Sequence, residues 1–213
     1  MLELIHKARE AVIEAIFPKT CFGCRQVGRY LCQNCLRGLR DPDVFYPAKA
    51  DFALTSFSYR SPAIEKALLK LKYSSASDIA KELAAVVSSD LAPYLKYGVK
   101  PVICEIPMTS KRKRKRGFNQ AEILARHVAK FLNLEYRPLL TKIRETRPQA
   151  EIKDREERLK NIKGVFAMKE NFSPSPFVVV VDDIITTGAT MNEAARVLKK
   201  SGVKKIICVA VAR

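Results

Sequence analysis

The chain has 213 residues, of which 39 are Lys or Arg and 22 are Asp or Glu, so its formal net charge is +17. That length suits one α/β domain with a small module, and the charge favours an anionic partner such as a phosphorylated metabolite, a nucleic acid or an acidic surface. No apolar run reaches the length of a membrane span, and charged residues interrupt the N-terminal apolar pattern where a signal peptide would be continuous, so we expect a cytoplasmic protein.

An amphipathic helix is predicted at the start of the chain, over residues 2–17. Its apolar residues recur at helical spacing, and Pro18 ends the pattern. The polar face carries acidic as well as basic residues, which suits docking on the protein's own body better than binding to an anionic membrane. We therefore treat residues 1–18 as a separate N-terminal segment.

Two Cys-x-x-Cys pairs follow, separated by seven residues. They consist of Cys21, Cys24, Cys32 and Cys35. Two such pairs can wrap one Zn²⁺ with four thiolates, whereas a redox Cys-x-x-Cys normally occurs once and beside a βαβ pattern. The sequence predicts a structural zinc module over residues 19–40, with no open coordination position for catalysis. Cys104 and Cys208 lie inside apolar runs and are predicted to be core residues.

Residues 36–50 are predicted to be a linker, because Asp41-Pro42-Asp43 and Pro47 interrupt any regular pattern. The domain over residues 50–213 then alternates strands and helices. Strands are predicted at residues 52–59, 101–106, 164–168, 178–181 and 205–212, and helices at 62–71, 78–96, 119–132, 154–160 and 191–198. A polar loop is expected from residue 136 to the fourth of these helices. This alternation predicts a doubly wound, mostly parallel sheet that binds its ligand at the carboxyl ends of the strands.

Six consecutive cations lie between a predicted strand and the helix that begins near Asn119. They are Lys111, Arg112, Lys113, Arg114, Lys115 and Arg116. Like charges repel, so a folded loop of this composition requires an anion. A solvated basic patch is the alternative, but the position of the run favours a ligand-binding loop. We predict these residues as nucleic-acid contacts.

The run Val178–Val181 is followed by Asp182 and Asp183, then by a turn rich in Thr and Gly, and then by a helix. Four valines suit a strand that is buried on both faces. The first backbone N–H groups of the following helix have no internal partners and can bind a phosphate. The two carboxylates can accept hydrogen bonds from sugar hydroxyls or bind a hydrated Mg²⁺. An ordinary loop capped by Thr side chains would not need two adjacent aspartates there.

This stretch resembles the 5-phosphoribosyl-1-pyrophosphate (PRPP) motif of the type I phosphoribosyltransferases. Together with the four cysteines, the run 114–121 and the stretch 149–166, it makes nearly the whole chain similar to the ComF family. These are bacterial proteins with a cysteine zinc module ahead of a type I phosphoribosyltransferase domain, and some are linked to DNA uptake. The resemblance implies that fold, a structural Zn, and Mg²⁺ bound with PRPP. It also makes other DNA-uptake proteins candidate partners.

The resemblance also implies roles for individual residues. Asp182 and Asp183 would bind the ribose hydroxyls, with Mg²⁺ nearby. The 5′-phosphate would lie against Thr186, Thr187, Gly188, Ala189 and Thr190, and Ile185 would also contact PRPP. The pyrophosphate loop would be Pro107, Met108, Thr109 and Ser110, with Arg116 beside it. A flexible loop around residues 141–158 would close over the site, with Arg147 or Arg158 reaching the pyrophosphate. The catalytic candidates are therefore Asp182, Asp183, Arg147 and Arg158.

Two hypotheses follow from these residues. In the first, the protein transfers a phosphoribosyl group from PRPP to an acceptor that no residue identifies, in DNA uptake or nucleotide-related metabolism. In the second, it is a single-stranded-DNA-binding competence factor whose phosphoribosyl site is a sensor or a relic. The intact acidic pair and Thr-Thr-Gly turn favour the first, and the cation run and net charge favour the second. Both can hold together.

Overall fold

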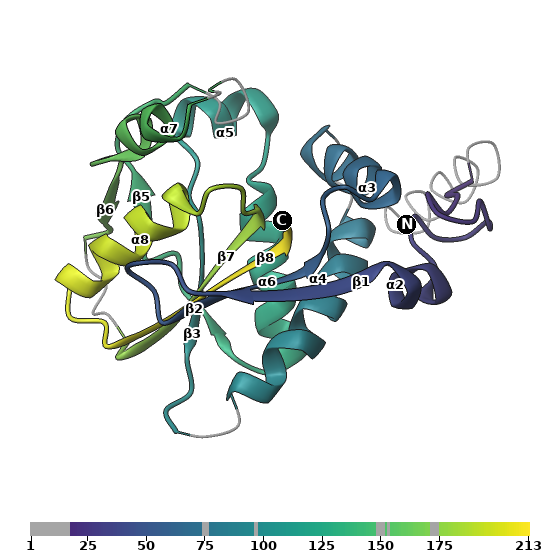
Figure 1. The fold of residues 1–213 in the computed structure, drawn as a ribbon, viewed down its shortest axis with the longest axis horizontal. Helices are drawn as coiled ribbons and strands as arrows, with labels where there is room; N and C mark the ends of the chain where they lie inside the picture. The colour runs from purple at the N-terminus through teal and green to yellow at the C-terminus, as the bar shows by residue number, and fades with distance from the viewer. Residues whose placement is uncertain (1–17, 74–76, 96–97, 148–151, 153, 171–174) are drawn as a thin grey trace, which may run out of the picture.

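A six-stranded sheet forms the centre of the protein, with the strand order β1-β2-β8-β7-β3-β4 (Figure 1). The computed structural model describes residues 18–73, 77–95, 98–147, 152, 154–170 and 175–213, so the helix predicted over residues 2–17 lies outside the described part. The strands are β1 (Arg40–Phe45), β2 (Phe52–Phe57), β3 (Val102–Glu105), β4 (Glu135–Tyr136), β7 (Phe177–Ile184) and β8 (Lys205–Ala212). β1 pairs antiparallel with β2, and the other neighbouring strands of this sheet are parallel, which confirms the predicted doubly wound, mostly parallel sheet.

Helices cover both faces of this sheet (Figure 1). They are α3 (Pro62–Tyr73), α4 (Ser77–Leu91) and α6 (Gln120–Leu132) on one face and α8 (Ala189–Lys200) on the other. Successive side chains of a strand point to opposite faces. Val179 and Val181 therefore pack in the core with α3, α4 and α6, while Val178 and Val180 pack in the core with α8. The four valines are buried on both faces, as predicted.

A smaller unit lies beyond α8 and is called the hood. It consists of β5 (Leu140–Lys142), β6 (Phe166–Met168) and α7 (Arg155–Ile162), and β5 pairs antiparallel with β6. The helix and strand predicted here are confirmed. The segment from residue 136, predicted as a loop, instead contributes the end of β4 and the whole of β5, because the fully buried Leu139 and Leu140 fix it in the core.

The predicted linker over residues 36–50 is wrong for most of its length. The structure has the helix α2 (Gln33–Leu39) and then β1 there. Pro42 is tolerated because β1 is an edge strand, where a missing N–H removes no bond that the sheet needs. The pairing of β1 with β2 also shifts register between Arg40 and Asp43.

The six cations form most of a helix, α5 (Ser110–Arg116), so the predicted loop conformation is also wrong. The Thr109 side chain caps the first turn by accepting a hydrogen bond from the Arg112 N–H at 3.3 Å. Gly117 ends the helix with φ of 87°, a left-handed conformation that favours glycine. Lys and Arg are good helix formers, and most of these side chains point into water, which lowers their mutual repulsion.

The helix predicted to reach residue 96 is shorter than expected. α4 stops at Leu91, and residues Ala92–Leu95 continue as a 3-10 turn that contains Pro93. Proline cannot donate the hydrogen bond that would extend the helix. No helix among the described ranges is long and apolar enough to cross a membrane.

Candidate functional site

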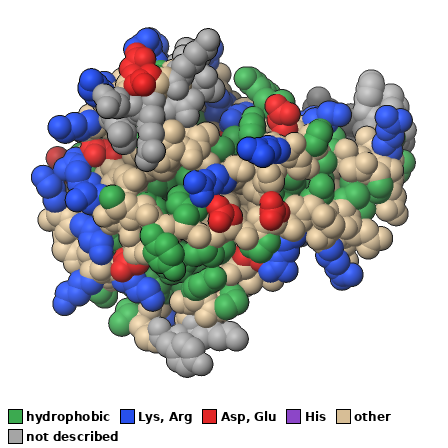
Figure 2. Space-filling model, viewed as in Figure 1, with side chains coloured by type: hydrophobic (Ala, Val, Ile, Leu, Met, Phe, Trp, Pro, Cys, Tyr) green, Lys and Arg blue, Asp and Glu red, His purple; other side chains and the backbone are tan. Residues whose placement is uncertain are grey.

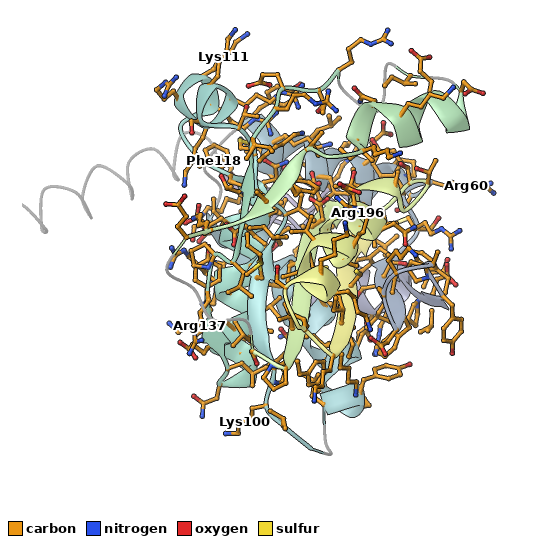
Figure 3. All side chains as sticks on the ribbon, turned by 90° about the vertical axis from the view of Figure 1, so that its left-hand side faces the viewer. Arg60, Lys100, Lys111, Phe118, Arg137 and Arg196 are labelled. Atoms are coloured by element: carbon orange, nitrogen blue, oxygen red, sulfur yellow. The ribbon has the colours of Figure 1, made fainter. Side chains whose placement is uncertain are left out.

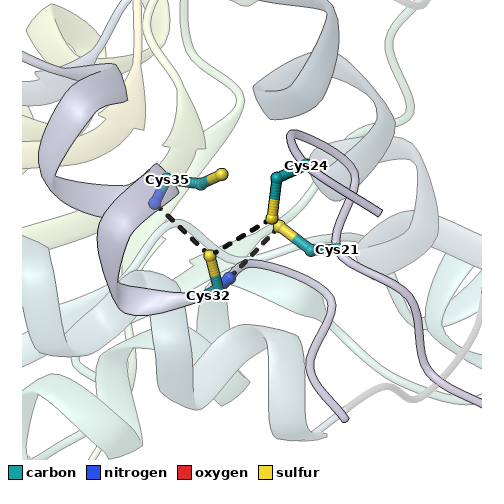
Figure 4. Close-up of side chains that lie close together, drawn as sticks. All are labelled: Cys21, Cys24, Cys32 and Cys35. Atoms are coloured by element: carbon teal, nitrogen blue, oxygen red, sulfur yellow. Dashed lines mark hydrogen bonds between the residues drawn. The ribbon is translucent and has the colours of Figure 1, made fainter. Parts of the chain in front are cut away.

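The four cysteines form one cluster, with their Sγ atoms all within 4.8 Å of one another (Figure 4). The Cys32 N–H donates to Cys21 Sγ at 3.3 Å, and the Cys35 N–H donates to Cys32 Sγ at 3.5 Å. A Cβ at Gly23 would lie 2.7 Å from Cys35 Sγ, so only glycine lets the chain approach this closely. The cluster brings together every cysteine predicted to bind zinc.

The electrostatics of the cluster favour a cation. Burial raises the pKa of Cys21, but hydrogen bonds from backbone N–H groups outweigh this effect and lower that pKa to about 6. Hydrogen bonds with the side chains of the other cysteines, above all that of Cys32, raise the pKa of Cys35 to about 12. Four sulfurs this close cannot all be thiolates without a positive ion between them. The donor set therefore fits one tetrahedral Zn²⁺ that fills its coordination with protein ligands.

Asp182 and Asp183 lie within β7, which continues past the predicted end of the strand at residue 181 and pairs with β8 as far as Ile184. Because side chains alternate along a strand, Asp182 points to the face of the sheet that α8 covers, and Asp183 points to the face that α6 covers. Burial, followed by the neighbouring Asp183 carboxylate, raises the pKa of Asp182 well above its usual value. Two carboxylates at the carboxyl edge of the sheet offer the oxygen ligands that Mg²⁺ prefers.

The turn after β7 leads directly into α8. Gly188 adopts φ of 75° at the N-cap position of this helix, and the Ala189 N–H donates to Thr187 Oγ1 at 3.4 Å. Thr186 is exposed, and Thr187 and Thr190 are partly exposed. Hydroxyl groups and the N-terminal N–H groups of α8 therefore lie together beside the acidic pair. This is the arrangement predicted from the sequence for one phosphate.

The predicted pyrophosphate loop, Pro107–Ser110, follows β3, the strand next to β7. The Ile106 N–H donates to the Val181 carbonyl oxygen at 2.8 Å, and Asn119 Nδ2 donates to the Ile106 carbonyl oxygen at 3.0 Å. These bonds fix the start of the loop beside the acidic pair. Thr109 is buried and donates to the Glu145 carboxylate, and the same carboxylate lies 3.8 Å from Arg112 Nε.

Two lysines that the sequence analysis did not identify also lie at this edge. Lys72 Nζ, at the end of α3, is 3.6 Å from Asp183 Oδ2, and Gln120 Nε2 donates to the same oxygen at 3.4 Å. Lys142 Nζ, at the end of β5, donates to Thr146 Oγ1 at 2.8 Å. Burial lowers the pKa of Lys142 to about 8, and the nearby Arg112 adds to this effect. No local pattern in the sequence marks either lysine.

The predicted arginines occupy different positions. Arg116 donates to Gln120 Oε1 at 2.7 Å, so one side chain separates it from Asp183. Arg147 pairs with Glu157 of α7 and is largely exposed, so this structure does not bring it to the acidic pair. Arg158 lies in α7, and its side chain is outside what the structure describes.

The cations of α5 are mostly exposed. Lys111 points away from the body at the same end of the sheet as Phe118, whereas Lys100 lies at the opposite end (Figure 3). Lys113 pairs with Glu122 at 2.7 Å and Arg112 contacts Glu145, so these two already have acidic partners. Lys111, Arg114 and Lys115 are exposed and offer the clearest contacts to an external anion.

Comparison with known proteins adds to this geometry. A sequence profile described as the phosphoribosyl transferase domain matches residues 83–213. With the strand order, this match confirms the type I phosphoribosyltransferase fold that the resemblance implied.

Three relatives show how far the likeness extends. Competence protein F of Haemophilus influenzae is 35% identical over 107 residues, covering 49% of this chain and 46% of that protein. DNA utilization protein YhgH of Salmonella typhi is 29% identical over 153 residues, covering 70% and 66%. Competence protein ComFC of Streptococcus pneumoniae is 28% identical over 187 residues, covering 85% and 80%. The match thus spans about half of the first relative and just under two thirds of the second. These names agree with the resemblance to the ComF family.

Proposed function

The chain belongs to the phosphoribosyl transferase domain family, and from this membership we propose that it binds PRPP with Mg²⁺ and transfers the phosphoribosyl group to an acceptor. One observation carries the proposal: the acidic pair, the phosphate turn before α8 and the loop Pro107–Ser110 meet at one edge of the sheet. The bond from the Ile106 N–H, just after β3, to the Val181 carbonyl oxygen of β7 joins these two neighbouring strands at that edge.

The chemistry is displacement of pyrophosphate from the anomeric carbon. The bond from that carbon to the pyrophosphate oxygen breaks, the oxygen keeps the electron pair, and the acceptor forms the new bond. Mg²⁺, when bound by Asp182 or Asp183, would supply positive charge to the pyrophosphate. Thr109 and Arg112 would add a hydroxyl donor and a cation for the charge that develops on the leaving group. Asp183 would accept from the ribose hydroxyls and fix the orientation of the sugar.

The names of the relatives suggest the setting. Two of them are called competence proteins and one a DNA utilization protein, so we assign this chain to DNA uptake or to nucleotide-related metabolism. The acceptor class stays open, because no described side chain at this edge is specific for a base, an amine or water.

A second candidate is binding of single-stranded DNA, with the phosphoribosyl site as a sensor or relic. The exposed side chains of Lys111, Arg114 and Lys115 favour it, since cations on one helix can neutralise neighbouring phosphates. Lys and Arg side chains are nevertheless spread over much of the surface in Figure 2, so net charge alone does not single out α5.

Isothermal titration calorimetry with PRPP and Mg²⁺ tests the first proposal, and repeating it with a short single-stranded DNA present tests the second. Binding of PRPP followed by pyrophosphate release with an added acceptor would support the enzyme. Binding of PRPP without turnover, but with altered DNA affinity, would support the sensor. No PRPP binding at any Mg²⁺ concentration would reject both uses of the site.

A further inference from the structure

We propose that Lys72, at the end of α3, is a positioning residue of the phosphoribosyl site. We also propose that the zinc module (residues 19–40, called the cysteine module below) holds Lys72 in place by docking on α3. The inference rests on the proposed PRPP binding. It gives the zinc module a role at a site to which it contributes no ligand. Two contacts on the last turn of α3 support it: Lys72 contacts Asp183, and Tyr30 of the module contacts Lys70.

Lys72 is well placed to orient Asp183. The Asp183 side chain is only 9% exposed and that of Lys72 27% exposed, so water screens their 3.6 Å ion pair weakly. Gln120 Nε2 contacts the same Oδ2 atom from α6, while the Ile184 N–H donates to Oδ1 at 3.0 Å. The carboxylate is thus fixed from three directions. Among the residues that the structure describes, Lys72 is the only cation that contacts this carboxylate.

The cysteine module docks on α3 and α4, which carry this lysine and its support. Leu31, between the two cysteine pairs, is completely buried in the core that α3 and α4 share. Its N–H donates to Glu82 Oε2 of α4 at 2.9 Å. Lys19 Nζ pairs with Asp78, also on α4, at 2.6 Å. These contacts anchor the module on both sides of its first cysteine pair.

Tyr30 of the module also contacts the last turn of α3, which carries Lys72. Lys70 Nζ lies 5.5 Å from the centroid of the Tyr30 ring, which stacks on Phe22 of the first cysteine pair at 5.7 Å. Lys70 and Lys72 belong to the same last turn of α3. α3 itself lies between the module and the carboxyl edge of the sheet (Figure 1). Metal binding that orders residues 21–35 therefore also fixes the turn that carries Lys72.

The test measures PRPP affinity by calorimetry, with Mg²⁺ present, for zinc-loaded protein and for protein stripped of zinc. The zinc chelator is removed by desalting before Mg²⁺ is added. Lys72→Met should weaken PRPP binding about ten-fold or more, because a buried charge-assisted contact is lost. Lys72→Arg should restore most of the affinity. Lys66→Met, which removes an exposed lysine from the same helix, is the matched control and should bind as the wild type does.

If zinc acts through Lys72, zinc removal and Lys72→Met should have non-additive effects on PRPP affinity. Zinc removal should weaken PRPP binding by the wild type and by Lys66→Met to the same extent, but should change Lys72→Met far less. Hydrogen exchange at the end of α3, measured without PRPP, should speed up when zinc is removed. Tyr30→Ala keeps all four cysteines, so it tests the docking contact even if stripped protein unfolds. It should reproduce part of the loss.

Three results would contradict three different statements: PRPP binding, the role of Lys72 and the role of the cysteine module. A wild type that binds no PRPP overturns the proposed function itself. Equal affinities of wild type and Lys72→Met leave the proposed function intact and reject Lys72 as a positioning residue. Zinc removal or Tyr30→Ala weakening wild type and Lys72→Met by the same factor rejects the role of the module.

Discussion

The hydroxyl group of Thr109 donates a hydrogen bond to the carboxylate of Glu145. Arg112 contacts the same carboxylate, and its NH2 group also donates to the Thr146 carbonyl oxygen at 3.2 Å. An internal anion from the segment after β5 therefore lies against the loop that we propose for pyrophosphate. If PRPP binds as proposed, this carboxylate would compete with its pyrophosphate for Thr109 and Arg112.

Replacing Glu145 by Gln should therefore strengthen PRPP binding. The amide keeps the shape of the side chain and loses the charge that competes with pyrophosphate. We expect a gain of roughly two- to ten-fold in affinity, since a half-exposed contact of this kind is worth about 1 kcal/mol. Calorimetry of Glu145→Gln against Glu135→Gln, which removes a charge from β4, provides the measurement. An equal gain in both variants would indicate a general charge effect.

The double substitution Asp182→Asn and Asp183→Asn should weaken Mg²⁺-dependent PRPP binding by about a hundred-fold or more, because two charge-assisted contacts are lost. The melting temperature should stay the same or rise, since adjacent like charges on β7 repel each other. Thr187→Val should cause a smaller loss by removing one donor to the 5′-phosphate. Wild-type affinity in the double variant would place the PRPP site elsewhere.

Much of this arrangement could be predicted because it is local in the sequence. The run Val178–Val181 indicates a strand buried on both faces, and the spacing of the four cysteines indicates a metal cluster. The contact of Lys72 with Asp183 could not be predicted, because it joins the end of α3 to β7 and leaves no periodic pattern. It depends on the order in which the strands pair.

Two local predictions, the loop at residues 111–116 and the linker at residues 36–50, are wrong because each relied on one sequence feature and neglected a second. The run of six cations was interpreted as a loop that binds an anion, but Thr109 and Gly117 cap the segment at both ends, and helix propensity then decides its conformation. The Asp-Pro-Asp sequence suggested a linker, but an edge strand tolerates Pro42.

The purified protein should contain about one Zn²⁺ per chain, since four cysteines complete a tetrahedral site. Cys24→Ser should lower the zinc content and the melting temperature, because metal binding contributes to the folding of so small a module. Cys104→Ala is the control, since that cysteine lies in the core beside β7 and should leave the zinc content unchanged. Elemental analysis without zinc, on reduced protein prepared without chelators, would reject the metal site.

Single-stranded DNA should bind, and the affinity should fall steeply with salt. Replacing Lys111, Arg114 and Lys115 by Gln should flatten the dependence of log K on log salt by about 2 units, since each lost phosphate contact removes about 0.7. Replacing three exposed lysines elsewhere, Lys66, Lys100 and Lys200, gives a variant of equal net charge. Fluorescence anisotropy at several salt concentrations compares the two. Equal slopes would exclude α5 as the contact surface.

The last prediction concerns Lys142 and the dependence of stability on pH. Burial lowers the pKa of its ammonium group from 10.5 in the unfolded chain to about 8 in the fold. Between these two values the unfolded chain binds more protons than the folded chain does, so the free energy of unfolding gains from this group as the pH rises. Below about pH 8 the buried ammonium group is charged, and the free-energy cost of burying that charge is then at its largest.

Lys142→Met removes this cost, so the variant should be more stable than the wild type at pH 7 by on the order of 1–3 kcal/mol. The advantage should shrink steadily between pH 8 and pH 10, as the wild-type lysine loses its proton in the folded state. Urea unfolding at several pH values measures the difference. Lys66→Met, which removes an exposed lysine of α3, is the control. A constant difference between Lys142→Met and wild type across this range would show that Lys142 is not desolvated in the fold.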